Sequence, residues 1–175
     1  PHLIKAHCVV RDYSKILIWG RNKEKAEKLA HSLDIKGKEI LVMSDLKEAL
    51  NVADVISCAT LSERPLIMGD WIKSGQHFDL VGAFTPNMAE VDSQAIAMSK
   101  VVVDTYEGAL SESGELITAL KEGHIKKKHI LSDLRELVLE EKNIRNHSND
   151  ITLFKSVGTA LEDLAAAELV IEKNL

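Results

Sequence analysis

The sequence has few aromatic residues, two cysteines and no long apolar run. Only 4% of its 175 residues are aromatic although 45% are hydrophobic. The core is therefore expected to consist of Leu, Ile, Val and Ala, a mixture typical of parallel strands covered by helices. Cys8 and Cys58 are not part of a CxxC pair, which favours a reduced, cytoplasmic compartment. No apolar run reaches membrane-spanning length and no signal peptide is visible, so we expect no membrane partner.

The signatures of several functional classes are also missing. The net charge is −5, with 22 Lys and Arg against 27 Asp and Glu. This balance argues against a nucleic-acid partner, because nucleic-acid binding needs a basic face. The seven His are scattered and form no HExxH motif, so no metal site is predicted. No GxSxG motif is present, and neither Ser62 nor Ser156 has a recognisable partner base, which disfavours a hydrolase triad.

Strand and helix patterns alternate along the whole chain. Apolar runs predict strands at residues 16–19, 39–43, 54–59, 77–82, 100–104 and 151–157. Helical spacing predicts helices at residues 1–11, 23–33, 45–51, 93–99, 106–113, 116–122, 131–140 and 159–173. We expect Ser44 to cap one helix, Gly114 and Gly123 to end two others, and residues 140–150 to form a surface loop. This alternation predicts an α/β fold, a doubly wound Rossmann-like parallel sheet with right-handed crossovers.

The beginning of the chain also carries a prediction. Residues 1–11 already have helical spacing, and no strand or Gly-rich turn precedes them. A helix in that place normally follows the first strand of a βαβ unit. We therefore expect the sheet to lack its first strand and the sequence to be a part of a longer protein.

Four of the predicted strands are followed by small or hydroxyl-bearing residues. Ligands in open α/β sheets bind at the carboxyl ends of strands. Small residues there leave room for a flat cofactor, and hydroxyls can bond ribose and carboxamide groups. One such strand end is usually an ordinary turn, but four together predict a dinucleotide site. The four groups are Gly20, Arg21 and Asn22; Thr60, Leu61 and Ser62; Gly82, Ala83 and Phe84; and Ser156, Val157 and Gly158.

The first group bears on the choice of cofactor. An acidic residue at this place in a dinucleotide fold binds the ribose 2′-OH, whereas an Arg accommodates a 2′-phosphate. Arg21 stands here with no carboxylate beside it. Its guanidinium is a permanently charged planar fork that suits phosphate oxygens. The segment favours NADP over NAD, and the alternative is a strand-to-helix loop with a solvated Arg.

Three carboxylates near the strand ends, Glu90, Asp92 and Asp104, could be read as paired acids. Asp104 ends a predicted strand, and Glu90 is placed where a helix is expected to begin. Acidic residues are favoured there by the helix dipole. We expect both to serve as structural helix caps.

Three longer segments resemble the ornithine cyclodeaminase/mu-crystallin family. They are residues 81–92 (VGAFTPNMAEVD), 102–114 (VVDTYEGALSESG) and 152–167 (TLFKSVGTALEDLAAA). Residues 59–65 (ATLSERP) fall where that family has its Thr-rich cofactor loop, and the order and spacing of the segments match over essentially the whole chain.

The resemblance implies that residues 1–175 form the NAD(P)-binding domain of a larger protein. A second domain would supply the substrate chemistry and the interface of a homodimer, so the catalytic residues are expected upstream of Pro1. The long helix at residues 159–175 is expected to pack toward that second domain. NADP(H) is favoured, with NAD(H) possible, and the substrate is a small imino or amino acid.

The resemblance also assigns roles to individual residues. Arg21 and Asn22 are similar to the pair that holds the adenosine 2′-phosphate. Thr60 and Leu61 are similar to the loop around the ribose and nicotinamide. Ser156, Val157 and Gly158 are similar to the segment that faces the nicotinamide ring.

Phe84 departs from the pattern of true ornithine cyclodeaminases, which carry an Asp there. Ala89 likewise replaces a basic residue common in many members. Phe cannot exchange a proton, and the Gly-Ala-Phe-Thr-Pro form is more similar to ketimine reductases, which reduce cyclic imines such as Δ1-pyrroline-2-carboxylate. We rank imine reduction first, cyclodeamination of L-ornithine to L-proline and ammonia second, and amino-acid dehydrogenation third. A non-catalytic dinucleotide binder stays open. Phe84 is interpreted as an apolar wall beside the nicotinamide or as a residue packed beneath the loop ending at Pro86.

Overall fold

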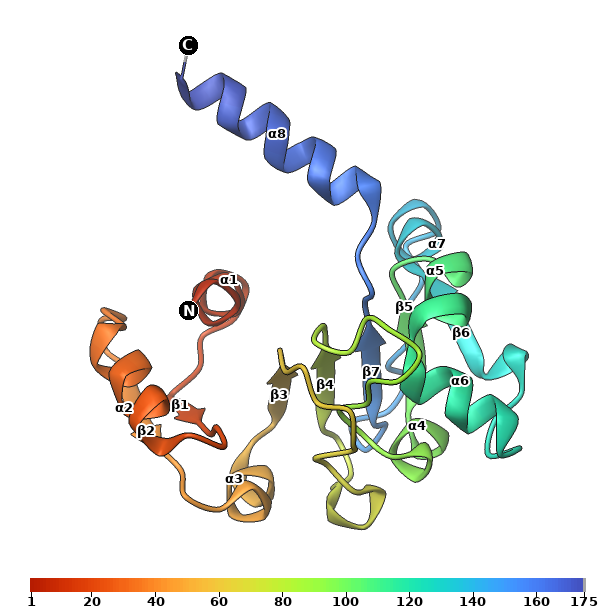
Figure 1. The fold of residues 1–175 in the computed structure, drawn as a ribbon, viewed down its shortest axis with the longest axis horizontal. Coiled ribbons are helices and arrows are strands. Elements are labelled where there is room, and N and C mark those ends of the chain that lie inside the picture. The colour runs from red at the N-terminus through yellow and green to blue at the C-terminus, as the bar shows by residue number, and fades with distance from the viewer. Residues whose placement is uncertain (175) are drawn as a thin grey trace. The chain divides into compact units, whose positions relative to one another are not determined.

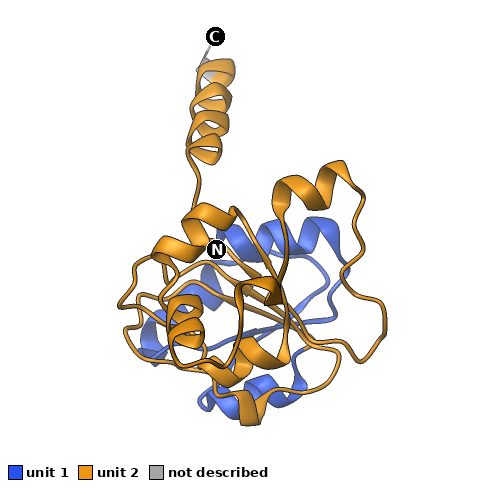
Figure 2. Ribbon diagram, turned by 90° about the vertical axis from the view of Figure 1, so that its right-hand side faces the viewer, with its two compact units in different colours: residues 1–53 blue, residues 54–175 orange. Residues whose placement is uncertain are grey.

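The computed structural model describes residues 1–174, which fall into two compact units (Figure 2). The first unit comprises Pro1–Ala53 and the second begins at Asp54. Each unit contains its own parallel sheet. Within the described residues, none of the helices combines the length and the apolar character needed to span a bilayer.

The first unit is built on a pair of parallel strands. Its elements are α1 (His2–Val10), β1 (Lys15–Ile18), α2 (Lys23–Ser32), β2 (Glu39–Val42) and α3 (Leu46–Val52). Strand β1 pairs with β2, and its residue Ile18 packs with Ala26 and Leu33 of the α2 region in a small apolar core. The cap of α3 is Asp45, whose side chain accepts a hydrogen bond from the Glu48 N–H at 2.8 Å. The prediction of Ser44 as the cap is wrong because the helix begins one residue later than expected.

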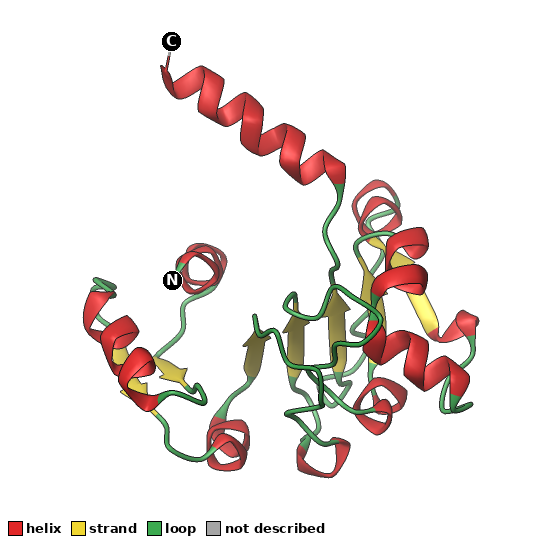
Figure 3. Ribbon diagram, viewed as in Figure 1, coloured by secondary structure: helices red, strands yellow, loops and turns green. Residues whose placement is uncertain are grey.

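The second unit contains a five-stranded parallel sheet in the order β3-β4-β7-β5-β6 (Figures 1 and 3). The strands are β3 (Val55–Cys58), β4 (His77–Leu80), β5 (Lys100–Val103), β6 (Ile130–Asp133) and β7 (Thr152–Lys155). Strand β7 comes last in the chain but lies between β4 and β5. Phe78, Leu80, Val101 and Val103 are fully buried, as expected for strands covered on both faces. The predicted parallel α/β fold is confirmed.

Helices and short turns connect these strands. They are η1 (Gly69–Trp71), α4 (Ser93–Met98), α5 (Tyr106–Glu112), α6 (Gly114–Lys121), η2 (Lys127–His129), α7 (Leu134–Leu139) and α8 (Ala160–Asn174). Helix α6 contributes the buried Leu116 and Ala119 to the core, and it contacts α4 and α5.

Two local predictions differ from the structure. The single helix expected at residues 131–140 is instead strand β6 followed by α7. Ile130 and Ser132 are buried in an alternating strand pattern, and Asp133 caps α7 by accepting from the Glu136 N–H at 2.8 Å. Gly114 begins α6 rather than ending a helix. Glycine is required there by close packing, because a Cβ would lie 2.1 Å from the Met88 carbonyl oxygen. Gly123, with φ of +77°, does follow the end of α6 as predicted.

Helix α8 differs from the other helices of this unit. Every residue from Ala160 to Lys173 is exposed. Large apolar side chains are among them, with Leu161 at 75% and Ile171 at 59% exposure. Helices in proteins are stabilised mainly by the packing of an apolar face. The apolar side chains of α8 are instead largely exposed.

Candidate functional site at the carboxyl ends of the strands

The loops that follow β3, β4 and β7 hold three of the four predicted site groups. Because these strands are parallel neighbours, their carboxyl ends share one edge of the sheet. The structure therefore brings together the groups at residues 60–62, 82–84 and 156–158. The fourth group, residues 20–22, follows β1 in the first unit.

Glu90 joins the loop after β3 to the loop after β4. Its side chain is fully buried. One carboxylate oxygen accepts from the Thr60 N–H at 2.7 Å and from the Thr60 hydroxyl at 2.9 Å, and the other accepts from the Gly82 N–H at 2.9 Å. A Cβ at Gly82 would lie 2.1 Å from the Thr60 nitrogen. Glycine is therefore required for the close approach of these two loops.

Asp104 joins the end of β5 to the loop after β7. It is 3% exposed. Its Oδ2 accepts from the Ser156 hydroxyl at 2.9 Å, the Val157 N–H at 2.7 Å and the Gly158 N–H at 2.8 Å. Its Oδ1 accepts from the Thr105 N–H at 2.6 Å. Hydrogen bonds to an ionised acceptor are stronger than neutral ones, so one carboxylate fixes the whole loop at residues 156–158.

The prediction that Glu90 and Asp104 cap helices is wrong. The caps are the residues directly before the helices: Asp92 accepts from the Ala95 N–H at 2.8 Å, and Thr105 accepts from the Gly108 N–H at 3.2 Å. Glu90 and Asp104 stand too early in the sequence to reach those N–H groups, and they bond strand-end loops instead. Sequence reasoning identified their place but not their distant partners, which are 30 residues from Glu90 and 52–54 residues from Asp104.

The hydroxyl groups at this edge already donate within the protein. The Thr60 hydroxyl donates to Glu90 and the Ser156 hydroxyl to Asp104, both at 2.9 Å. The Ser62 hydroxyl donates to the Arg64 carbonyl at 2.7 Å. A ligand could still use their lone pairs as acceptors. The expected donation from these hydroxyls to a ribose would first require these bonds to break.

Apolar side chains are exposed beside these polar bonds. Phe84 is 43% exposed and Leu61 is 65% exposed, whereas Ala83 between the loops is fully buried. The exposure of Phe84 argues against the alternative in which its ring is packed beneath the loop ending at Pro86. Exposed apolar groups next to buried, fully bonded carboxylates suit a flat, partly apolar ligand.

A buried ion pair lies beneath the same edge. Lys155 ends β7, and its Nζ is 3.1 Å from an Oε of Glu115 on α6, with both side chains fully buried. Burial raises the pKa of Glu115, and the neighbouring Lys155 cation opposes that rise. Sequence reasoning missed this pair, because Lys155 ends a predicted strand, and a buried Lys in that place cannot be distinguished from a solvated one by sequence.

Cys58 at the end of β3 is unsuited to act as a nucleophile. Burial raises the pKa of its thiol far above the usual range, and the negative charges of Glu90, Glu115 and Asp79 raise it further. The thiolate is the reactive form of cysteine. The thiol therefore stays protonated, and its chemistry is that of a small apolar side chain.

The group in the first unit is arranged as a helix start. Asn22 caps α2 by accepting from the Lys25 N–H at 2.9 Å. That bond uses the Asn22 side-chain oxygen and leaves its amide NH2 as a donor. Arg21 is exposed immediately before it. A cation, an amide donor and a helix N-terminus side by side form an arrangement that suits a phosphate.

The described residues offer no metal site. Across residues 1–174, no group of three or more His, Cys, Asp or Glu side chains could hold a metal ion. The chemistry available at the strand ends is that of buried carboxylates, backbone amides and exposed apolar groups.

Comparisons with known proteins agree on one family. The sequence profile of the ornithine cyclodeaminase/mu-crystallin family matches residues 3–175. Protein SAR DEFICIENT 4 of Arabidopsis thaliana is 42% identical over 180 residues, which cover 100% of this chain and 55% of that protein. The Δ1-pyrroline-2-carboxylate reductase of Colwellia psychrerythraea is 36% identical over 98% of this chain and 55% of its own length.

A solved structure has the same fold. The Δ1-pyrroline-2-carboxylate reductase of Thermococcus litoralis, in complex with NADH and L-proline, superposes with a TM-score of 0.93 at 40% identity. The match covers 98% of this chain and 53% of that one. The chain thus spans about half the length of the relatives it matches.

Proposed function

The chain belongs to the ornithine cyclodeaminase/mu-crystallin family, and we propose that it is the dinucleotide-binding part of an NAD(P)H-dependent reductase. Its substrate would be a cyclic ketimine such as Δ1-pyrroline-2-carboxylate. The proposal rests on the likeness, over nearly the whole chain, to a reductase solved with NADH and L-proline. L-proline is the compound that forms when this ketimine gains a hydride and a proton.

The strand ends of the second unit would hold the nicotinamide half of the cofactor. A bound nicotinamide dinucleotide would supply the hydride. The space beside Gly82 is filled by the Thr60 backbone and Glu90, so the small residues at 82–83 serve the packing of the two loops, and Gly158 with φ of +94° turns the loop after β7. Phe84 and Leu61 would form an apolar wall that excludes water from the path of the hydride.

Arg21 and Asn22 would hold the adenosine 2′-phosphate, so NADPH is proposed as the preferred cofactor. A charge-assisted hydrogen bond of this kind contributes roughly 1.5–3 kcal/mol. Arg21→Ala should therefore weaken NADPH binding about tenfold to a hundredfold and leave NADH binding nearly unchanged. Titration of both cofactors against both proteins measures this. Equal loss for the two cofactors, or no initial preference for NADPH, would contradict the assignment.

The rest of the activity is assigned to residues outside this chain. The proton donor and the groups that bind the substrate carboxylate would lie in a second domain, as would the interface of a homodimer. The exposed apolar side chains of α8 are proposed to pack against that domain. The two free thiols, Cys8 and Cys58, agree with a cytoplasmic location.

Cyclodeamination of L-ornithine is the second candidate, and Phe84 disfavours it. General acid–base groups typically contribute about 10²–10⁴-fold in rate, and Phe84 cannot provide such a group. The test is to assay the full-length protein with Δ1-pyrroline-2-carboxylate plus NADPH, and with L-ornithine plus NAD. Rapid oxidation of NADPH with little ammonia release is expected. Fast ammonia release from ornithine would reverse the ranking, and binding of cofactor without either reaction would favour a non-catalytic binder.

A further inference from the structure

Glu90 and Asp104 are both buried carboxylates at the strand ends, a placement that is unusual for charged loop residues. Each is buried, and each gathers N–H and hydroxyl donors from two separate segments onto one carboxylate. Burying a charge is unfavourable unless it is fully paired or hydrogen-bonded. The chain meets this requirement twice along one edge of one sheet, at the three loops proposed to receive the nicotinamide.

We propose that Glu90 and Asp104 are positioning residues, which hold these loops in the shape that receives the nicotinamide half of the cofactor. Neither is proposed to contact the cofactor. The inference rests on the proposed function, because it concerns the same edge of the sheet. The two carboxylates would affect the position of the bound cofactor and hence catalysis, in addition to any effect on the stability of the fold.

The contacts of Glu90 show why its charge matters. Oε1 accepts both donors of Thr60, and Oε2 accepts the Gly82 N–H. A Gln side chain has the same shape but only one acceptor oxygen. Its NH2 group would face an N–H donor on one of the two loops, so Glu90→Gln would push one loop away from the other.

The same argument applies to Asp104. Three donors from residues 156–158 meet on Oδ2, and the Thr105 N–H meets Oδ1. In Asp104→Asn one of these two positions becomes an NH2 group that faces N–H donors. The loop after β7 or the start of α5 would then have to shift.

Close packing makes small shifts matter here. A Cβ at Gly82 would lie 2.1 Å from the Thr60 nitrogen, 2.2 Å from the Thr60 carbonyl oxygen and 2.3 Å from Glu90 Oε1. The backbones of the two loops are therefore in direct contact around the carboxylate. A displacement of about 1 Å in a site can reduce a rate about a hundredfold, so loop position is expected to affect turnover.

Asp92 provides a matched control. Its carboxylate is also hydrogen-bonded to backbone, accepting from the Gly69 N–H at 3.0 Å and the Ala95 N–H at 2.8 Å. These bonds join η1 to the start of α4, which is outside the strand-end loops. Both donors bond Asp92 Oδ1, so an Asn could keep them, whereas Asp92→Ala removes both bonds without touching the proposed cofactor site.

The experiment compares the full-length protein with Glu90→Gln, Glu90→Asp, Asp104→Asn and Asp92→Ala. The Kd for NADH and NADPH is measured by fluorescence titration, KM and kcat by oxidation of NADPH with Δ1-pyrroline-2-carboxylate, and stability by thermal unfolding. Glu90→Gln and Asp104→Asn should weaken both cofactors by about tenfold to a hundredfold, because cofactor binding would have to restore the loop positions that one or two charge-assisted bonds hold in the wild type. The ratio of the Kd values for NADPH and NADH should not change, because these loops are not the ones proposed to bind the 2′-phosphate. The kcat should fall as well.

Asp92→Ala should lower the unfolding temperature with little change in either Kd or kcat. Glu90→Asp, which keeps both acceptor oxygens, should recover part of the cofactor affinity that Glu90→Gln loses. If Glu90→Gln and Asp104→Asn lose only stability, as Asp92→Ala does, the positioning role is wrong. If the wild-type protein neither binds nor oxidises NAD(P)H, the proposed function fails instead, and the two failures are thereby told apart.

Discussion

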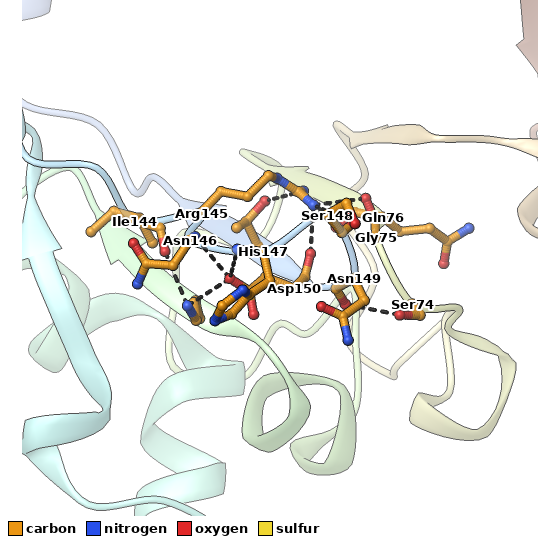
Figure 4. Close-up of polar contacts among 12 residues, drawn as sticks. Ser74, Gly75, Gln76, Ile144, Arg145, Asn146, His147, Ser148, Asn149 and Asp150 are labelled. Carbon is orange, nitrogen blue, oxygen red and sulfur yellow. Dashed lines mark hydrogen bonds and ion pairs between the residues drawn. The ribbon is translucent and has the colours of Figure 1, made fainter.

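The two edges of the five-stranded sheet fix their loops with different charged groups. At the carboxyl edge, the buried anions Glu90 and Asp104 accept hydrogen bonds from backbone N–H groups. At the amino edge, the cation Arg145 donates to backbone carbonyls, including those of Gly75 at 3.0 Å and Asp150 at 2.6 Å (Figure 4). Each edge thus satisfies the backbone groups that its loops leave unpaired, as buried backbone requires.

Further contacts hold the loop at the amino edge, among them an ion pair between Asp150 and Lys100 of β5. Arg145 also donates to the Thr152 hydroxyl at 2.9 Å at the start of β7. Asp150 accepts from Lys100 Nζ at 2.7 Å and from the N–H groups of Asn146 and His147, both at 2.9 Å. Residues 144–150 are therefore bonded to β5, to β7 and to the segment directly before β4, although the sequence predicted only a surface loop there.

The comparison separates stability from function. At the amino edge the charged groups bond a loop that carries none of the predicted site residues. At the carboxyl edge the bonded loops are the ones that carry them. Substitutions at the two edges should therefore have different consequences for cofactor binding, and four of them test this difference.

The largest effect is expected from Gly82→Ala at the carboxyl edge. The new Cβ would meet the Thr60 backbone at 2.1 and 2.2 Å, and backbone cannot move aside as a flexible side chain could. We expect a loss of about 3 kcal/mol in the free energy of unfolding together with loss of cofactor binding. Urea unfolding and cofactor titration measure the two. Gly20→Ala is the control for stability, because a Cβ there has no neighbour closer than 3.9 Å; equal losses in both variants would show that the close approach is unimportant.

Arg145→Ala at the amino edge should be next in size. It removes donors to four carbonyls, those of Gly75, Gln76, Ser148 and Asp150, and to the Thr152 hydroxyl. Since a hydrogen bond to a charged group contributes about 1.5–3 kcal/mol, we expect a loss of about 2 kcal/mol in the free energy of unfolding. The Kd for NADPH should stay within twofold or so, because no predicted site group is bonded here. The exposed Arg135→Ala serves as the matched variant, and a large rise in Kd for Arg145→Ala alone would remove the distinction between the edges.

Ser156→Ala should have a smaller effect at the carboxyl edge. It removes the hydroxyl that donates to Asp104 at 2.9 Å, but the Val157 and Gly158 N–H groups still bond that carboxylate. A loss of about 1 kcal/mol in the free energy of unfolding is expected, with a weaker effect on the cofactor than Asp104→Asn. An effect on cofactor Kd as large as that of Asp104→Asn would mean that the hydroxyl itself contacts the ligand.

The smallest effect is expected from the titration of Asp150. The hydrogen bond from Lys100, with those from the His147 and Asn146 N–H groups, lowers the pKa of Asp150 from 3.8 to about 2. A carboxyl with a lowered folded-state pKa stabilises the fold above its unfolded pKa, and that contribution is lost as the pH falls through the folded-state pKa. The free energy of unfolding of the wild type should therefore decline between pH 3.8 and about 2 more steeply than that of Asp150→Asn. Parallel pH profiles for the two proteins would show that Asp150 does not contribute.

Much of the fold could be predicted because its signals are local. Alternating apolar strands and amphipathic helices, with Gly123 after α6, show in a few residues each. Strand β6 was missed because the segment around Leu131 and Leu134 fits helical spacing as well as it fits a strand followed by a capped helix. Short apolar segments leave that ambiguity in any single sequence.

Only part of the candidate site could be predicted from the sequence. The small residues at the strand ends were visible in the sequence, and three of their groups do share one edge. The groups that organise them were not visible, because Glu90 bonds Thr60 across 30 residues and Asp104 bonds Gly158 across 54. A loop carboxylate that accepts hydrogen bonds from distant N–H groups can have the same local sequence as one that faces water. The partners of Arg145 could not be predicted for the same reason.

The place of β7 also affects how the second unit can form. This strand pairs with β4 on one side and β5 on the other, yet it is the last strand in the chain. Until residues 152–155 arrive, β3 and β4 can pair with each other, and so can β5 and β6, but nothing joins the two pairs. Long-range strand pairing slows folding because the entropy of loop closure is lost before the contacts form. The amides that pair β4 and β5 with β7 should therefore gain protection from hydrogen exchange together in one late kinetic phase, and early protection of those amides would contradict this order.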